Sequence, residues 1–243
     1  MKEVIAARRF PSDEHRNLVM NLMAMLAVRN PRVRSTFGNF LGNISEKMTS
    51  LMLHSRERWE GMKEQAVKDG VEVMPDVDYE DVKEAFQSRR IKAQASKSYL
   101  VALDLDMVEP VLKTLNLREW RFLTALEGNQ FVTSDDPVVL DSFDGRERTL
   151  MNSPGFGVGG TFVFFALSPD LALYGPLDAP NLPTELDARA VARINGVTMR
   201  YARRHALAKS EDFMLQGSDG SYLTSIQMPE FIRRMSKGSH GTD

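Results

Sequence analysis

The sequence has no cysteine, and this absence excludes several kinds of chemistry at once. A disulfide framework, a thiolate nucleophile and a cysteine-ligated metal site all require that residue. Histidine is also scarce, because only 4 histidines occur in 243 residues and they lie far apart along the chain. A histidine-rich zinc site is therefore not expected.

The chain also lacks a long apolar run and an excess of charge of either sign. No segment approaches the roughly 18 consecutive apolar residues of a membrane span, and the N-terminus MKEVIAARRFPSDEH has no apolar signal-peptide core. The formal net charge of -2 provides no overall attraction to nucleic acid or to an anionic membrane. We expect a cytoplasmic protein with no membrane partner, whose basic surfaces arise from local clusters.

Apolar residues recur at helical spacing from about residue 12 to residue 117. Ser12 is a suitable N-cap for a first helix, which Pro31 ends. A second helix is predicted over residues 37–52, where apolar side chains keep a spacing of three and four. Two more helices are predicted around residues 79–86 and over residues 97–114, with a loop at VKDGVEVMPDVD.

The pattern changes near Leu117, where aromatic and β-branched residues become frequent. Residues 118–176 are predicted to be mainly strand, with a hairpin turn at Gly128 and Asn129. The run TFVFFALSP is apolar enough for both of its faces to be buried. Residues 187–235 are predicted to form a helix, a short strand at HALAKS and a closing helix at MPEFIRRM, and residues 236–243 a disordered tail.

This order, with helices first and strands later, predicts an α+β fold. We expect a helical N-terminal half packed on an antiparallel or mixed sheet, with a late amphipathic helix, in a single domain over residues 1–235. The stretch GFGVGG formally satisfies the dinucleotide fingerprint G-x-G-x-x-G, but that fingerprint requires a following helix. A strand-like segment follows here, so GFGVGG is interpreted as a flexible β-connection.

Two adjacent carboxylates lie in the segment FVTSDDPVV at residues 131–139. Ser134, Asp135 and Asp136 are candidate catalytic residues, because paired carboxylates at a strand end can bind a divalent metal or hold a proton. Asp135 and Asp136 are the candidate ligands of Mg²⁺ or Mn²⁺. A structural alternative stays open, in which Ser and Asp side chains accept backbone N–H groups in a turn before Pro137.

Five arginines fall on one face of the helix predicted between Asp187 and Arg204, and an apolar stripe lies roughly opposite. They are Arg189, Arg193, Arg200, Arg203 and Arg204. Such a face suits bidentate contacts with the phosphates of a nucleic acid or nucleotide, although an ordinary solvated face is an alternative. Gly196 on this face would let a ligand or another backbone approach closely.

Arg29 belongs to another basic cluster, with Arg32 and Arg34, at the break between the first two predicted helices. Arg29 is a candidate substrate-binding residue. Its position also has a structural explanation, because the C-terminal end of a helix favours cations.

The segment FVTSDDPVV resembles a motif of the bacterial family catalogued as domain of unknown function 4238, in which F-I-T-S-D-N-P-V-V follows W-x-x-L. Trp120 and Leu123 match the W-x-x-L segment. The stretches MAMLAVRNPRVR and FFALSPDLAL, and Ile194 with Asn195, are similar to further family segments in the same order. The resemblance covers about residues 12–210, implies no agreed function, and makes Asn195 a candidate substrate-binding residue.

The chain departs from the family pattern in three places. Asp136 stands where the family usually has Asn, and Asn30 where it usually has Thr. The family's N-terminal segment H-x-x-P-x-x-Y-L-x-x-F has no match, so the chain is interpreted as a shortened homologue or as one half of a split protein, in which a protein partner would supply that segment. Two functions are compatible with these residues: a metal-dependent hydrolase of phosphodiesters, or a non-catalytic module that recognises a protein or a nucleotide.

Overall fold

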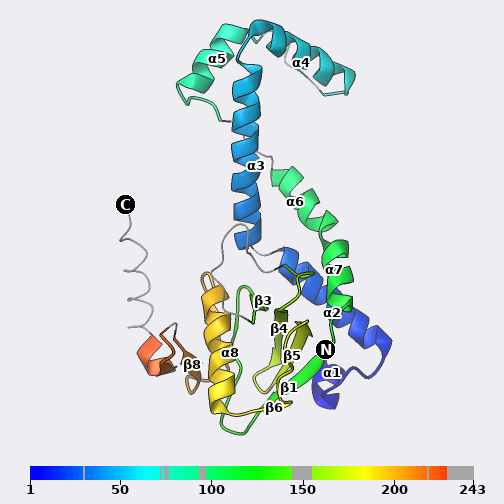
Figure 1. The fold of residues 1–243 in the computed structure, drawn as a ribbon, viewed down its shortest axis with the longest axis vertical. Helices are drawn as coiled ribbons and strands as arrows, with labels where there is room; N and C mark the ends of the chain where they lie inside the picture. The colour runs from blue at the N-terminus through cyan, green and yellow to red at the C-terminus, as the bar shows by residue number, and fades with distance from the viewer. Residues whose placement is uncertain are drawn as a thin grey trace. The chain divides into compact units, whose positions relative to one another are not determined.

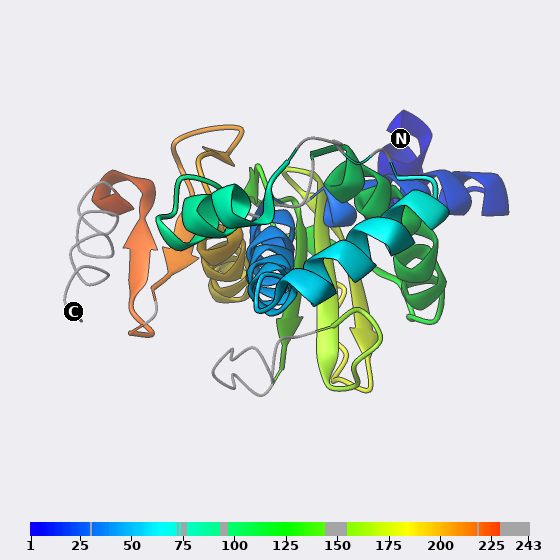
Figure 2. The ribbon, with the colours of Figure 1, turned by 90° about the horizontal axis from the view of Figure 1, so that it is seen from above.

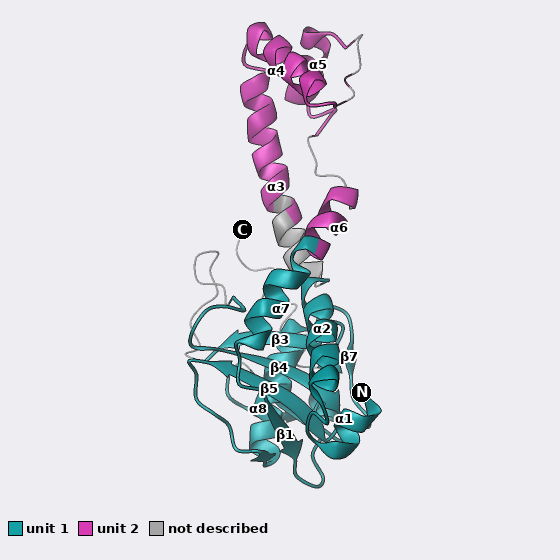
Figure 3. Ribbon diagram, turned by 90° about the vertical axis from the view of Figure 1, so that its right-hand side faces the viewer, with its two compact units in different colours: residues 1–30, 106–243 teal, residues 31–105 magenta. Residues whose placement is uncertain are grey.

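The computed structural model describes residues 1–29, 31–71, 73, 77–92, 97–143, 155–217 and 219–228, without the side chains of residues 31–37, 39 and 97. The chain forms two compact units, residues 1–30 with 106–243, and residues 31–105 (Figure 3). The predicted helix at MPEFIRRM and the predicted tail at residues 236–243 lie outside the described residues, apart from Met228. A single domain over residues 1–235 stays a prediction.

The first unit is built on a mixed sheet of 5 strands in the order β3-β4-β5-β1-β6. Neighbouring strands are antiparallel except β1 and β6, which are parallel. The chain is α+β, as predicted. The strands of the sheet are β1 (Arg121–Ala125), β3 (Val138–Ser142), β4 (Thr161–Ser168), β5 (Leu171–Leu177) and β6 (Glu185–Leu186).

Two smaller ladders accompany this sheet. The strand β2 (Thr133–Ser134) pairs with β7 (Ala206–Leu207), which lies within the predicted strand HALAKS. The strand β8 (Met214–Gln216) pairs with β9 (Tyr222–Thr224), and a short 3-10 helix, η1 (Ser225–Gln227), follows.

Helices cover both faces of the five-stranded sheet (Figures 1 and 2). The helices α1 (Lys2–Ala7), α2 (Asp13–Val28) and α7 (Val108–Asn116) contribute to the hydrophobic core on one face. The helix α8 (Ala188–Tyr201) packs against the other face. Successive strand residues alternate between these cores, so Phe164 lies with α8 and Phe165 with α2 and α7. This confirms that TFVFFALSP forms a strand that is buried on both faces.

Local sequence signals explain several helix boundaries. The Ser12 side chain accepts the N–H of His15 at 3.4 Å and caps α2, as predicted. The helix predicted over residues 97–114 is instead two helices, α6 (Lys97–Asp106) and α7. In a continuous helix the ring of Pro110 would clash with the carbonyl of Asp106, four residues earlier.

The predicted hairpin at Gly128 and Asn129 is wrong. A tight turn is present, because Gly128 has a φ of 83° and the Asn129 N–H donates to the Leu126 carbonyl at 3.1 Å. The strands on either side of it do not pair, since β1 lies between β5 and β6 and β2 pairs with β7. The stretch GFGVGG leads into β4 with no helix between, as expected of a β-connection.

The second unit is helical. It contains α3 (Pro31–Met52), α4 (Arg56–Lys68), α5 (Tyr79–Gln87) and most of α6. The helical spacing predicts α3 and α5, whereas α4 has too few apolar residues to show a stripe. Among the described helices of both units, none is long and apolar enough to cross a bilayer.

Candidate functional site

Ser134 ends β2 in a tight turn. Its hydroxyl donates to the carbonyl of Asp136 at 2.9 Å, and the N–H of Asp136 donates to the Ser134 oxygen at 3.1 Å. Ser134 is buried. These contacts are the serine-to-backbone bonds of a turn. The catalytic role of Ser134 stays a prediction.

Asp135 fixes the segment that follows α8. Its N–H donates to the carbonyl of His205 at 3.1 Å, and the β2–β7 pairing continues from there. Its carboxylate accepts the N–H groups of Arg203 at 2.9 Å, Arg204 at 3.1 Å and His205 at 3.5 Å. Burial by itself would raise the pKa of Asp135, but these donors together hold the pKa below its ordinary value. The carboxylate is therefore ionised at neutral pH, with both oxygens engaged.

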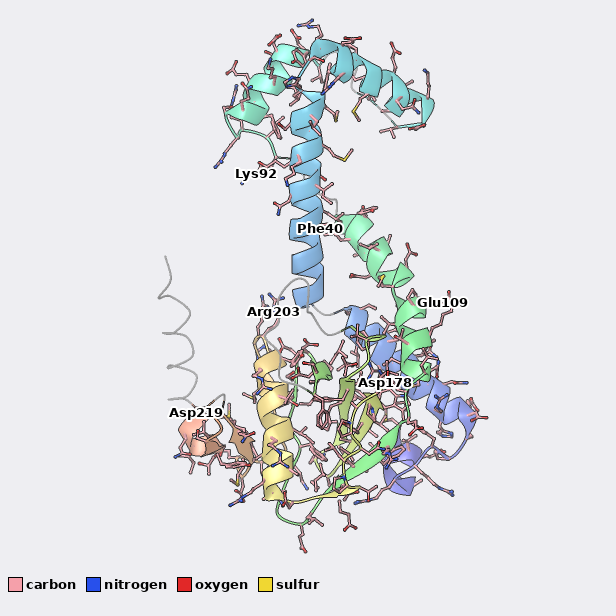
Figure 4. The ribbon with its side chains drawn as sticks, viewed as in Figure 1. Phe40, Lys92, Glu109, Asp178, Arg203 and Asp219 are labelled. Carbon is pink, nitrogen blue, oxygen red and sulfur yellow. The ribbon has the colours of Figure 1, made fainter. Side chains whose placement is uncertain are left out.

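The three residues held by Asp135, namely Arg203, Arg204 and His205, are called the basic turn here. They are exposed and follow Ala202, the C-cap of α8, and the C-terminal end of a helix favours cations. Figure 4 shows Arg203 at this end of α8. Within the described parts of the chain, the side chains of Arg203 and Arg204 make no hydrogen bond or ion pair. Both guanidinium groups are therefore accessible to a ligand.

The last turn of α8 is also attached to β3. The guanidinium of Arg200 lies 3.6 Å from the carboxylate of Asp141, whose side chain is 11% exposed. The hydroxyl of Tyr201 donates to the carbonyl of Leu140. Asp141 offsets the charge of Arg200, so Arg200 has less charge to offer a phosphate than the basic turn has.

The other predicted arginines do not join this group. Arg189 lies in the first turn of α8, with its guanidinium 6.0 Å from the ring centroid of Tyr222 in β9. Arg193 is exposed one turn later. Arg189 and Arg200 are about 16 Å apart along the helix axis, at about 1.5 Å per residue. These side chains therefore do not converge on one phosphate group.

The structure describes only one side chain of the basic cluster of Arg29, Arg32 and Arg34. Arg29 is exposed at the C-terminal end of α2, as its structural explanation requires. The side chains of Arg32 and Arg34 lie outside the described residues. Binding of substrate by Arg29 stays a prediction.

Asn195 lies on the buried side of α8 and is fully covered. Its amide oxygen accepts the N–H of Val132 at 3.0 Å, and its amide nitrogen donates to the carbonyls of Gln130 and Met214, both at 2.9 Å. The side chain thereby joins α8 to the segment before β2 and to β8. The contacts that the structure shows are internal, and substrate binding by Asn195 stays a prediction.

Gly196 is the point at which β8 crosses α8. A Cβ atom there would overlap the carbonyl oxygen of Gln216, and it would lie 3.1 Å from the backbone nitrogen of the same residue. The close approach predicted at this glycine is therefore to another backbone. Asn195 and Gly196 together set the position of β8 on the helix.

The chain matches the sequence model of a family described as "Protein of unknown function (DUF4238)" over residues 1–212. It belongs to this family. The family predicted from the resemblance is thereby confirmed. No curated protein and no solved structure matches the chain. Membership of DUF4238 names no activity, and a partner that supplies an N-terminal segment stays a prediction.

The donor set around Asp135 in this DUF4238 chain does not suit a divalent metal. Both carboxylate oxygens face N–H groups, which a cation would have to displace. Asp136 is 2% exposed. Over the described ranges, no group of three His, Asp or Glu residues could hold a metal ion. The predicted Mg²⁺ or Mn²⁺ site therefore has no support from these contacts.

Arg118 is a buried cation whose burial the sequence pattern does not predict. It is 3% exposed, and its guanidinium donates to the carbonyls of Phe156 at 2.6 Å and Gly175 at 2.8 Å, and to the Thr161 hydroxyl at 2.9 Å. Burial lowers the pKa of Arg118 to about 10, and Tyr174 acts in the opposite direction. Arg118 thus ties the connection before β4 to the sheet. A lone arginine between a helix and a strand gives no indication of burial.

Proposed function

We propose that the chain is a non-catalytic binding protein that recognises phosphate groups of a nucleic acid or nucleotide through the basic turn. The observation that carries this proposal is the Asp135 carboxylate, which accepts the N–H groups of all three residues of the turn. The backbone beneath Arg203 and Arg204 is thereby ordered before a ligand arrives. Binding then costs less conformational entropy than it would for a free loop.

The chemistry of the basic turn supports phosphate as the recognised group. A guanidinium group presents its donors in a planar fork that fits phosphate oxygens. Arg203 and Arg204 provide two such forks next to one carboxylate, whose oxygens already accept backbone N–H groups. The turn therefore has positive charge that its own contacts leave available.

Hydrolysis of phosphodiesters, the alternative function, has less support. Asp135 would have to release its backbone N–H groups in order to bind a metal or to activate water. Release would also free the basic turn, which the same hypothesis needs for phosphate binding. A binding role uses these contacts as they stand.

The proposal is tested by fluorescence anisotropy with a labelled single-stranded oligonucleotide and, separately, with a labelled nucleoside triphosphate, over a range of salt concentrations. We expect saturable binding that weakens with salt, with the two ligands showing whether a polynucleotide or a nucleotide is preferred. The double variant Arg203→Gln/Arg204→Gln should bind about tenfold or more weakly. The slope of log K against log salt for the oligonucleotide should fall by about 0.7 for each phosphate group that the variant no longer neutralises.

The matched control is Arg58→Gln/Lys68→Gln, which removes the same charge from exposed positions on α4. This control should bind as the native chain does. Absence of binding at low salt, or equal binding by the double variant of the basic turn, would overturn the proposal. A cleaved oligonucleotide in a parallel incubation with Mg²⁺ or Mn²⁺ would instead support the hydrolase.

A further inference from the structure

A pocket of about 430 Å³ lies between the end of α3 and the end of α5, within the second unit. Small-molecule sites have volumes of about 300 to 1,000 Å³. Glu46, Ser50 and His54 line the pocket from α3 and the residues after it, whereas Lys83 and Phe86 line it from α5. Residues three or four apart lie on the same face of a helix, so each set forms one face that is directed at the other helix.

Tyr79, the first residue of α5, connects the two sides of this pocket. Its side chain is buried, and its hydroxyl donates to the carbonyl of Leu53 at 2.8 Å. The ammonium group of Lys83 lies 5.2 Å from the Tyr79 ring centroid, and the guanidinium of Arg56 lies 5.4 Å from it. The start of α5 is therefore hydrogen-bonded to the residue that follows α3.

The charged side chains of the lining carry a net positive charge. Lys83 and Arg89 carry positive charge, His54 adds a third basic group, and Glu46 is the acidic member of the lining. In the part of the chain that the structure describes, the side chains of His54 and Arg89 make no hydrogen bond or ion pair. Phe86, which is partly buried, contributes an aromatic surface. The lining thus combines anion-binding groups with one aromatic side chain.

Arg89 occupies a backbone position that favours glycine. Its φ is 58°, and it follows the C-cap of α5, where its N–H donates to the carbonyl of Phe86 at 3.1 Å. The N–H of Arg90 donates to the carbonyl of Ala85 at 2.8 Å, which completes a helix-ending motif normally closed by glycine. With arginine at this position the backbone is more strained than it would be with glycine, and the guanidinium lies at the pocket.

We propose that this pocket binds a small organic anion, with one phosphate or carboxylate group and an apolar or aromatic body. The acid group is held by Arg89 and Lys83, and the body packs against Phe86. Glu46 offsets part of the positive charge, so a single acid group is expected. This site is independent of the basic turn, which belongs to the first unit.

The full-length chain is titrated with phenyl phosphate, benzoate and inorganic phosphate, and binding is measured by calorimetry and by amide chemical shifts. We expect saturable binding of at least one organic probe, with shifts at pocket residues, and weaker binding of inorganic phosphate. The better organic probe identifies the acid group. Arg89→Gly should weaken binding about tenfold, the loss expected for one charge-assisted hydrogen bond.

Arg89→Gly removes the guanidinium at a position where glycine is favoured, so this variant is expected to fold with unchanged or raised Tm. The matched control is Arg90→Gln, since Arg90 pairs with Glu84 at 2.7 Å and does not line the pocket. This control should bind as the native chain does, as should Arg203→Gln/Arg204→Gln. No saturable binding of either organic probe, equal binding by Arg89→Gly, or inorganic phosphate binding as tightly as both probes would overturn the proposal.

Discussion

Asp135 joins two segments that are far apart in the sequence. Its carboxylate accepts N–H groups that follow α8, 68 to 70 residues later in the chain. An ionised carboxylate is a stronger hydrogen-bond acceptor than a protonated one, which accounts for the lowered pKa of this group. The charge of Asp135 is therefore part of what holds the basic turn in place.

Replacement Asp135→Asn is expected to lower the free energy of unfolding at neutral pH by about 1 kcal/mol, as for loss of a capping side chain. The pKa of Asp135 is lower in the folded chain than its ordinary value of 3.8. Its stabilising contribution is therefore complete above about pH 3.8 and is lost as pH falls through the folded-state pKa. Urea unfolding of both proteins should show a difference that shrinks on acidification, and a difference independent of pH would contradict this role.

At the scale of the secondary-structure elements, α8 is the element on which the candidate site depends. Its buried face packs on the sheet through Val191 and Tyr201, and its last residues position the basic turn. Asn195 and Gly196 place β8 against the same helix. A change in how β8 packs on α8 is therefore expected to affect the fold of the first unit.

Replacement Gly196→Ala should destabilise the chain by about 1 to 3 kcal/mol, the cost of inserting a methyl group into a packed contact. The added Cβ meets backbone atoms of Gln216, which cannot turn aside as a flexible side chain would. Urea unfolding provides the measurement. The control is Gly61→Ala on α4, where a Cβ meets nothing within 4 Å and alanine should favour the helix. Equal stability of both variants would contradict the close packing of β8.

At the scale of the whole molecule, the two units differ in what they bury. Both hydrophobic core clusters lie entirely within residues 1–30 and 106–243. Among the described residues of the second unit, the buried apolar side chains are Leu53 and Tyr79. Buried apolar area supplies most of the stability of a fold, so the second unit is expected to open more readily.

Brief digestion with trypsin should therefore cleave first within residues 31–105, at sites in the described parts of that unit. The fragments on either side should remain associated under native conditions, because α2 and α7 contribute to one core. Mass spectrometry identifies the cuts, and gel filtration tests the association. Exposed sites such as Lys113 and Arg193 in the first unit serve as internal controls. Earlier cleavage at those sites would contradict the expected order, and equal rates of cleavage in both units would favour a single cooperative domain.

Sequence patterns alone determined the parts of the fold that depend on neighbouring residues. Helical spacing predicts α2, α3, α5 and α8, because a helix that packs on a core needs an apolar stripe. The spacing also identifies the buried face of α8, where Val191 and Tyr201 lie. The cap at Ser12 is likewise a local contact, with His15. The break before Pro110 follows a local rule too, although the spacing alone predicts one continuous helix.

Tertiary structure alone decided which distant segments meet. The turn at Gly128 has local hairpin chemistry, yet its flanking strands pair elsewhere, because β5 and β7 offer partners that a local pattern does not reveal. The acceptor role of Asp135 and the burial of Arg118 also depend on residues far along the chain. The sequence identified the residue types of the candidate site. Their partners, and hence their chemistry, follow from the long-range contacts that folding creates.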